Sequence, residues 1–257
     1  MAKVVIAYSG GVDSTFLLKA ALDTLGKDNV LACIAAGSSL PQAELQRAVD
    51  IAREIGAEII TVEPAEMNDP NFTRNAPDRC FHCKTHLFHM LIDVAKERNI
   101  EYVIYGNNYD DRADFRPGAK AAEKLGIRAP LMQAELTKPD IRQLSRNAGL
   151  PTADQPASPC LASRIPYGID ITAEKLIQVE QAEKFIRELG MTEFRVRHHG
   201  QIARIEVPAE QIEKLASAGV REKVVEYLKS LGFTYITLDL QGFRSGSLNE
   251  TLKEKKI

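Results

Sequence analysis

The stretch Val4-Val5-Ile6-Ala7-Tyr8-Ser9-Gly10-Gly11-Val12-Asp13-Ser14 decides the fold of this chain of 257 residues. Its first five residues form an apolar run that is typical of a strand covered on both faces. From Phe16 to Leu25 the apolar residues follow helical spacing, so the stretch predicts a strand, a tight glycine turn and a helix. Backbone amides at such a helix start, together with the helix dipole, form a site for anions.

The turn between this strand and helix has the composition of a phosphate-binding loop. Gly10 and Gly11 let a phosphate approach the backbone closely. The hydroxyl groups of Ser9 and Ser14 are further donors, and Asp13 can hold a magnesium ion that bridges phosphate oxygens. The loop matches neither the Walker A pattern nor Gly-x-Gly-x-x-Gly. The alternative interpretation is a simple helix cap by Asp13 or Ser14 after a glycine turn.

Strands and helices alternate along the first 150 residues, which predicts an α/β fold with a doubly wound parallel sheet. Ligands in such sheets bind at the carboxyl ends of the strands. After the first strand and helix, we expect strands at residues 30–36, 59–62 and 102–105, and helices at 41–55, 81–98, 119–125 and 139–148.

We expect residues 151–257 to form a smaller α+β domain. It begins in a proline-rich stretch, residues 149–168, that predicts a hinge or an active-site loop. The periodicity then predicts a helix at 172–189, two further helices, and strands at 194–198, 203–207 and 235–240.

The charge balance excludes a general attraction to polyanions. The chain has 33 Lys and Arg against 35 Asp and Glu, a formal net charge of -2, so we expect no nucleic-acid partner. No apolar run approaches the ~20 residues that a membrane helix needs, and the N-terminus does not resemble a signal peptide. We therefore expect a cytoplasmic protein with no membrane partner.

Three of the four cysteines are candidate ligands or nucleophiles. Cys80 and Cys83 lie three residues apart at an expected helix start, where backbone amides and nearby cations favour the thiolate. Two thiolates do not complete a metal site, so Cys160 in the proline-rich stretch is the third candidate. Three thiolates can hold an iron-sulfur cluster with one open iron. Cys33 lies within an apolar strand and is expected to be a core residue.

Ser9-Gly10-Gly11-Val12-Asp13-Ser14 resembles the signature of the PP-loop ATP pyrophosphatases, which cleave ATP to AMP and pyrophosphate. The resemblance implies an ATP pyrophosphatase domain over residues 1–150. It places the adenine against Ala7 and the end of the second strand near Ala35 and Ala36, with Ser38 close by. The stretch from Gly106 to Asp111 resembles the second nucleotide segment of these enzymes, in which the acidic pair helps bind magnesium pyrophosphate. The alternative for this stretch is a solvated turn.

A narrower resemblance is carried by Pro159-Cys160-Leu161-Ala162-Ser163-Arg164, by Arg195-Val196-Arg197 and by Gly242-Phe243-Arg244-Ser245-Gly246. It also includes the stretch from Arg112 to Gly118. These stretches resemble the LarE family of ATP-dependent sulfur transferases, which serve the synthesis of a nickel-pincer nucleotide cofactor. The resemblance implies adenylation of a carboxylate of pyridinium-3,5-biscarboxylic acid mononucleotide. A catalytic cysteine, here Cys160, then attacks the acyl adenylate. Cleavage of its Cβ–S bond leaves a thiocarboxylate on the substrate and dehydroalanine in the protein.

The same resemblance implies that Lys84, Ser163 and Arg164 line the substrate site. Arg195 and Arg197 lie two apart on an expected strand and therefore on one face, where they can grip the substrate phosphate. The alternative is a pair of solvated arginines. The resemblance leaves open the roles of the remaining candidates, which are Glu183, Glu206, His82, His198 and His199.

The pair Cys80 and Cys83 leaves two sulfur sources open. Members of the LarE family with a single cysteine give up their own sulfur once. Members with this pair and the loop cysteine are thought to carry a [4Fe-4S] cluster, whose additional sulfide is the donor. We expect the cluster here, with Cys160 as its third ligand.

Two other functions are compatible with the motifs. A tRNA thiolase uses the same ATP chemistry on a polynucleotide, and it predicts a broad basic surface. A sensor that carries a cluster and binds ATP without turnover predicts no release of pyrophosphate. The family resemblance further implies a homo-oligomer, with a hexamer among the options.

Overall fold

The structure is a computed structural model that describes residues 1–113, 117–156, 158–244 and 246–250. Residues 114–116 and Ser245, which belong to stretches of the family resemblance, lie outside this range. Packing groups the chain into two units. The first holds Met1–Phe72 and Pro77–Pro159, and the second holds Thr73–Ala76 and the chain from Cys160 on.

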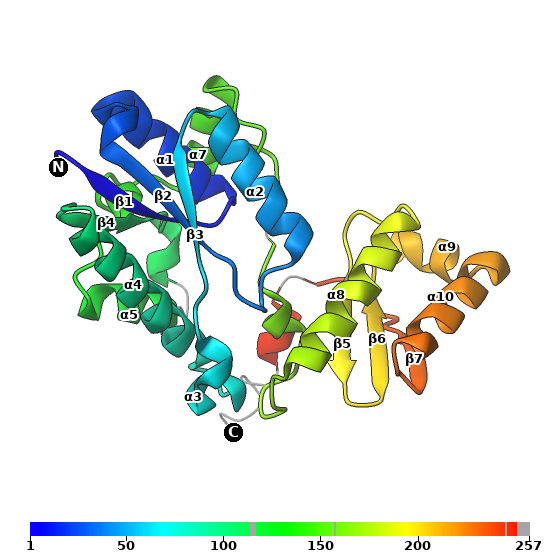
Figure 1. Cartoon of the computed structure of the whole chain (residues 1–257). Coiled ribbons are helices and arrows are strands. Elements are labelled where there is room, and N and C mark those ends of the chain that lie inside the picture. Colours follow the sequence, from blue (N-terminus) through cyan, green and yellow to red (C-terminus); the bar gives the residue numbers. More distant parts are fainter. Residues whose placement is uncertain (114–116, 157, 245, 251–257) are drawn as a thin grey trace. The chain divides into compact units, whose positions relative to one another are not determined.

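The first unit is built on a four-stranded parallel sheet with the strand order β3-β2-β1-β4 (Figure 1). The strands are β1 (Val4–Tyr8), β2 (Val30–Ala35), β3 (Glu58–Val62) and β4 (Tyr102–Tyr105). The helices are α1 (Val12–Leu25), α2 (Gln42–Glu54), α4 (Arg79–Glu97), α5 (Pro117–Lys124), α6 (Pro130–Gln133) and α7 (Lys138–Asn147). The short helix α3 (Pro70–Thr73) ends where the chain enters the second unit.

Helices cover both faces of this sheet. Alternate strand residues such as Ile6 pack with α1, α2 and α7, and the residues between them, such as Val5, pack with α4 and α5. Burial on both faces explains why these strands are apolar without alternation. The doubly wound α/β class predicted from the sequence is therefore confirmed.

The strand order reverses at β1. The chain runs outward from β1 to β2 and β3, and then returns to place β4 on the other side of β1. Crossovers leave β1 and β4 on opposite faces, which opens a crevice at the carboxyl ends of these two strands. The loop after β1 and the segment after β4 are the two stretches that the sequence singled out.

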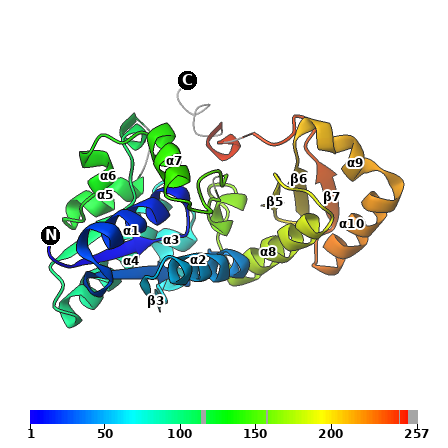
Figure 2. The ribbon, with the colours of Figure 1, turned by 90° about the horizontal axis from the view of Figure 1, so that it is seen from above.

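The second unit has a three-stranded mixed sheet with the order β5-β6-β7. Its elements are β5 (Arg195–His199), β6 (Ile202–Glu206), β7 (Tyr235–Leu238), α8 (Ala173–Glu188), α9 (Ile212–Ala216) and α10 (Ala218–Ser230). Figures 1 and 2 show α8 and α10 along one face of this sheet, where Ile186 and Leu228 pack on Val196. No helix in the described part of the chain is long and apolar enough to span a membrane.

Because His198 is buried, we predict that acid destabilises the second unit. Its Nε2 lies 3.0 Å from Gln178 Oε1, and burial lowers its pKa below the ordinary value of 6.5. Below pH 6.5 His198 is therefore protonated in the unfolded chain while it stays neutral in the folded one. Its contribution to the free energy of unfolding is complete above pH 6.5 and decreases as the pH falls below that value. We expect a lower urea midpoint at pH 5.5 than at pH 7.5, and a smaller difference in His198→Gln, whose amide can still donate to Gln178. Equal differences in the two proteins would contradict this role.

Candidate active site

The loop after β1 closes on itself through its two serines. The backbone N–H of Ser9 donates to Ser14 Oγ at 3.2 Å, and the two hydroxyl oxygens lie 3.0 Å apart. Gly11 is the N-cap of α1, and among the described residues no side-chain cap is formed at this helix start. The alternative of a cap by Asp13 or Ser14 is therefore wrong, and the first amides of α1 have no capping side chain, as an anion site requires.

Close packing beneath the loop accounts for its glycines. Gly10 has a φ of +70°, and a Cβ there would lie 2.4 Å from the Cβ of Ala48 on α2. Tyr8 donates its hydroxyl to the backbone oxygen of the same alanine at 3.1 Å. The loop thus rests directly on α2, and its shape is set by backbone contact.

Gly106 brings the segment after β4 against the start of α1. A Cβ at this position would lie 2.8 Å from the nitrogen of Ser14 and 3.0 Å from the carbonyl carbon of Asp13. Two backbones therefore touch at the crevice between β1 and β4.

We expect Gly106→Ala to disturb this contact and with it the phosphate loop. The strain should cost about 1–3 kcal/mol of stability, and misplaced amides should lower ATP turnover by about tenfold. Thermal unfolding and pyrophosphate release measure the two effects. Gly219→Ala is the control, because a Cβ there meets nothing within 4 Å. Wild-type turnover in Gly106→Ala would show that the contact does not shape the loop.

Asp13 is held by two side chains from the other side of this crevice. Asn108 Nδ2 donates to its Oδ2 at 3.1 Å, and Lys138 Nζ donates to its Oδ1 at 2.7 Å. A carboxylate at a helix start beside a lysine is a suitable place for a magnesium ion and for phosphate oxygens. The prediction that Asp13 binds magnesium is compatible with this geometry and stays a prediction.

Sequence reasoning missed Lys138, although the sequence contained a signal for it. Lys138 is the first residue of α7, whose start is capped by Thr137 and Asp140. A lysine at that position opposes the helix dipole, so its presence there calls for an anionic partner. Its backbone N–H also donates to Asp110 Oδ2 at 2.8 Å, which ties α7 to the segment after β4.

The segment after β4 is a buried turn. Asp111 Oδ2 accepts from the backbone N–H of Asn108 at 3.0 Å, and Asn108 Oδ1 accepts from that of Asp111 at 3.2 Å. Asn107, Asn108 and Asp111 are each at most 6% exposed, so the alternative of a solvated turn is wrong. Within the described residues, Asn107 Nδ2 is buried with no acceptor. A buried donor of this kind fits a site that a ligand completes.

The residues expected around the adenine lie at the same edge of the sheet. Ala7 pairs with Cys33 and Tyr105 in the neighbouring strands, and Ala36 continues the pairing by donating to Val62 O at 2.8 Å. Ser38 lies in the loop that follows. The structure is compatible with the expected adenine position, which stays a prediction.

The cysteines fall into both units. Cys80 is exposed and Cys83 partly exposed in the first turns of α4, and Cys160 is partly exposed at the start of the helical turn Leu161–Arg164. The described part of the chain brings no three His, Cys, Asp or Glu side chains together as a metal site. Cys33 is confirmed as a core residue, since it is 1% exposed and burial raises its pKa to about 12.

Two arginine–glutamate pairs support the helical turn Leu161–Arg164 that begins after Cys160, here called the Cys160 turn. Arg164 donates from Nε and Nη2 to Glu183 at 2.8 and 2.9 Å. Arg197 makes the same bidentate pair with Glu206 at 3.0 and 2.8 Å. All four residues are buried, so the alternative of solvated arginines is wrong for Arg197.

Arg195 differs from its two arginine neighbours. Its guanidinium lies 5.0 Å from the centre of the Phe243 ring, and it donates from Nη1 to its neighbour's backbone oxygen, Phe194 O, at 2.6 Å. Burial, and next the positive charge of Arg164, lower its pKa to about 10. An anion bound beside Arg195 would stabilise its positive charge and so oppose both the loss of hydration and the repulsion by Arg164.

The other candidates have ordinary surroundings. Lys84 lies with its Nζ 5.9 Å from the Phe88 ring, and His82 Nε2 lies 3.5 Å from Asp78. His199 is half-buried, and burial lowers its pKa. The expectation that Lys84 lines the substrate site stays a prediction.

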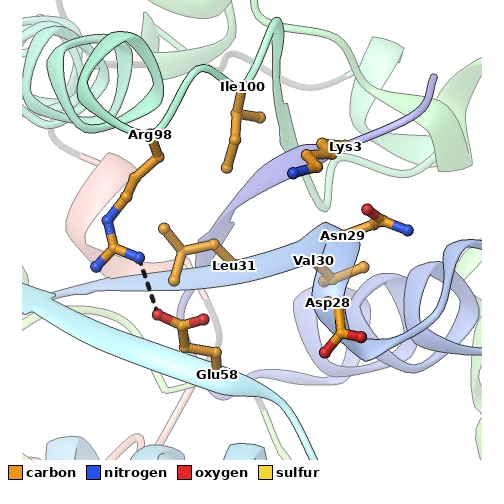
Figure 3. Close-up of a pocket in the computed structure, with 8 residues that line it drawn as sticks. All are labelled: Lys3, Asp28, Asn29, Val30, Leu31, Glu58, Arg98 and Ile100. Carbon is orange, nitrogen blue, oxygen red and sulfur yellow. Dashed lines mark hydrogen bonds and ion pairs between the residues drawn. The ribbon is translucent and has the colours of Figure 1, made fainter.

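A small cavity of about 110 Å³ lies elsewhere in the first unit (Figure 3). It is at the amino ends of β2 and β3, where Arg98 and Glu58 form an ion pair of 3.1 Å. This is the edge of the sheet opposite the phosphate loop, so the cavity is not the expected nucleotide site.

Comparisons with known proteins agree with the motifs. The family model for NAD synthase matches residues 1–80. The chain is 44% identical, over 97% of its length and 93% of the relative, to an uncharacterized protein of Synechocystis sp.. It is 39% identical, over 99% of its length and 92% of the relative, to the pyridinium-3,5-bisthiocarboxylic acid mononucleotide synthase of Lactiplantibacillus plantarum. It is also 26% identical, over 72% of its length and 64% of the relative, to one subunit of the glutamine-hydrolyzing GMP synthase of Archaeoglobus fulgidus.

Proposed function

We infer the reaction of this chain from one premise: it belongs to the family of the pyridinium-3,5-bisthiocarboxylic acid mononucleotide synthase, the LarE family of PP-loop sulfur transferases. We propose that it activates a carboxylate of pyridinium-3,5-biscarboxylic acid mononucleotide with ATP and converts it to a thiocarboxylate. The observation that carries the proposal is the helix start of α1, whose N-cap makes no side-chain bond and where Asp13 faces Lys138 across the β1–β4 crevice.

The ATP step belongs to residues 1–150 in this proposal. The substrate carboxylate attacks the α-phosphorus of ATP, and pyrophosphate leaves. The α1 amides and Lys138 stabilise the negative charge of the phosphates, and Asp13 and Asp111 would hold a magnesium ion, which would neutralise further phosphate charge. Ser9 and Ser14 add hydroxyl donors to the same phosphates. The product is an acyl adenylate, in which AMP is a good leaving group.

The sulfur step belongs to residues 151–257. In the route without a cluster, the Cys160 thiolate attacks the activated acyl carbon and expels AMP, which leaves a thioester. Loss of the Cys160 α-proton to a base then breaks the Cβ–S bond, so that sulfur stays on the substrate and dehydroalanine remains. We propose that Arg195 holds the substrate phosphate, because its guanidinium lies against the Phe243 ring and burial lowers its pKa, so that a bound anion would stabilise its charge.

We further propose that Cys80, Cys83 and Cys160 ligate a [4Fe-4S] cluster in the loaded protein. Two of these thiols already lie on one accessible helix start, which fits the role of thiolate ligands. When bound, the cluster would supply a sulfide at its open iron as the sulfur donor. Cys160 would then be a ligand that is not consumed.

The test uses anaerobically purified chain with ATP, Mg²⁺ and the mononucleotide. We expect pyrophosphate release that depends on the mononucleotide, and a product in which sulfur replaces one carboxylate oxygen. Pyrophosphate without a thiolated product would refute the proposed function, and no pyrophosphate at all would favour an ATP-binding sensor. Thiolation of tRNA in a parallel reaction would favour a tRNA thiolase.

The sulfur source is decided on the same preparation. Loss of about 34 Da from the chain after one turnover marks conversion of Cys160 to dehydroalanine. Iron and sulfide bound to the chain, with its mass unchanged over several turnovers, mark the cluster. Repeated turnover by Cys80→Ala would show that the cluster is not the donor.

A further inference from the structure

The short turn that presents Cys160 is held near both ends by buried arginines. Cys160 is the N-cap of the helical turn Leu161–Arg164, and its backbone oxygen accepts from Ser163 N at 2.9 Å. Arg164 Nη1 donates to this same oxygen at 3.1 Å. Arg197 Nη1 donates to the backbone oxygen of Ser163 at 2.9 Å. A carbonyl group at the start of the turn and one near its end therefore each have a guanidinium partner.

Each of these arginines is fixed by a carboxylate on a different element. Glu183 on α8 pairs with Arg164, and it also accepts from the backbone N–H of Val196 at 3.1 Å. Glu206 on β6 pairs with Arg197, which donates to Ser247 Oγ as well, at 2.9 Å. Bidentate pairs of this kind define the orientation of the guanidinium group as well as its position.

The hydrogen-bond count leaves these arginines little capacity for a substrate. A guanidinium has five N–H groups. Arg197 uses four of them, on Glu206 twice, on Ser247 and on Ser163. Arg164 uses its Nε, its Nη2 and its Nη1 inside the protein and is 3% exposed. Neither can grip a phosphate bidentately while these contacts last.

We propose that Arg164 and Arg197, each backed by its glutamate, form a clamp that fixes the Cys160 turn and thereby the direction in which the Cys160 sulfur is presented. The four residues Arg164, Glu183, Arg197 and Glu206 are the arginine clamp. They are positioning residues, and this inference deepens the proposed function and depends on it for its kinetic part. The substrate phosphate is left to Arg195.

Because the arginine clamp is buried, its ion pairs restrict the geometry of the turn more than they stabilise the fold. Isolated charges in an apolar interior are costly, so buried ion pairs contribute little net stability but hold a unique geometry when fully hydrogen-bonded. The apolar residues of the turn, Leu161 and Ala162, are 1% and 0% exposed, so the turn cannot shift as a whole without losing its packing. Hydrogen bonds and packing thus fix the backbone of the turn, while Cys160 at its start stays partly exposed.

The kinetic test compares Arg164→Lys and Arg197→Lys with Arg195→Lys. Lysine keeps the charge but cannot make the bidentate pair and the carbonyl contact together. We expect kcat for sulfur transfer to fall about tenfold or more in the first two variants, with KM for the mononucleotide within about twofold. In Arg195→Lys we expect KM to rise about tenfold. A rise in KM with unchanged kcat in the clamp variants would overturn the clamp in favour of substrate binding.

Hydrogen exchange tests the clamp without any turnover. The amides of residues 160–165 should exchange about tenfold faster in Arg164→Lys and Arg197→Lys than in the wild type. Arg195→Lys and Arg221→Lys, the latter an exposed arginine on α10, should leave this exchange unchanged. Unchanged exchange in both clamp variants would refute the proposal. Faster exchange in a chain that thiolates no mononucleotide would instead refute the proposed function and keep the clamp.

A second variant covers the case in which the lysine variants unfold. Arg164→Met combined with Glu183→Gln removes the ion pair while filling its space and leaving an acceptor for Val196 N. Neutral replacement of a buried pair is generally tolerated. We expect this chain to fold, as judged by thermal unfolding, and to show the faster exchange at residues 160–165. Wild-type exchange in it would also overturn the clamp.

Discussion

Replacing Cys160 with serine is expected to abolish sulfur transfer while leaving the ATP step in place. Serine has nearly the same size and can keep the backbone contacts of the turn, since these use the Cys160 carbonyl oxygen. Its hydroxyl is a far weaker nucleophile than a thiolate and brings no sulfur. The loss should therefore be complete within detection, at least about 1000-fold in rate.

Two measurements separate the expected defects. Thiolated product is followed by mass spectrometry, and pyrophosphate release is measured in the first turnover, when the acyl adenylate still forms. Ser158→Ala is the matched control, because Ser158 is exposed in the same stretch of chain. Thiolated product from Cys160→Ser at more than about one-hundredth of the wild-type rate would assign the sulfur to another group.

Asp13→Asn is expected to cause the second-largest loss, and it falls on the ATP step. The substitution keeps the shape of the side chain but removes the negative charge between Lys138 and Asn108. An amide binds magnesium weakly, so the phosphate charge is poorly neutralised as pyrophosphate leaves. We expect pyrophosphate release to fall about 100- to 1000-fold, with a smaller loss of ATP binding.

Pyrophosphate release at increasing magnesium concentration measures this effect. A weakened magnesium site should show a higher magnesium requirement as well as a lower maximal rate. Asp23→Asn is the control, because Asp23 lies on the same helix and pairs with Lys19 at the surface. A wild-type magnesium response in Asp13→Asn would place the ion elsewhere.

The residues around Cys160 show which roles a sequence motif can assign and which it cannot. Sequence resemblance assigned Cys160, Ser163, Arg164, Arg195 and Arg197 to one region, and the structure places all five on adjoining elements of one unit. The structure also gives the three arginines different surroundings. Arg164 and Arg197 face glutamates, whereas Arg195 carries a charge that burial destabilises. Residue type alone did not distinguish these roles.

Local rules were enough for the framework of the first unit. The apolar run of β1, the glycines after it and the helical spacing of α1 act within a few residues of one another, so the sequence predicted them directly. Alternation of strands and helices then restricts the topology, because parallel strands need right-handed crossovers. The doubly wound sheet and the carboxyl-edge position of the phosphate loop followed from these rules.

Tertiary structure alone decided which charged groups meet. Asp13 and Lys138 are 125 residues apart, and Arg164 finds Glu183 only because α8 packs against β5 and the Cys160 turn. The pair of Arg197 with Glu206 depends on the register of β5 with β6, in which a slip of one residue would turn every side chain to the other face. Charge–charge contacts depend on distance in space, and spacing along the chain does not encode that distance beyond a helix turn or a hairpin.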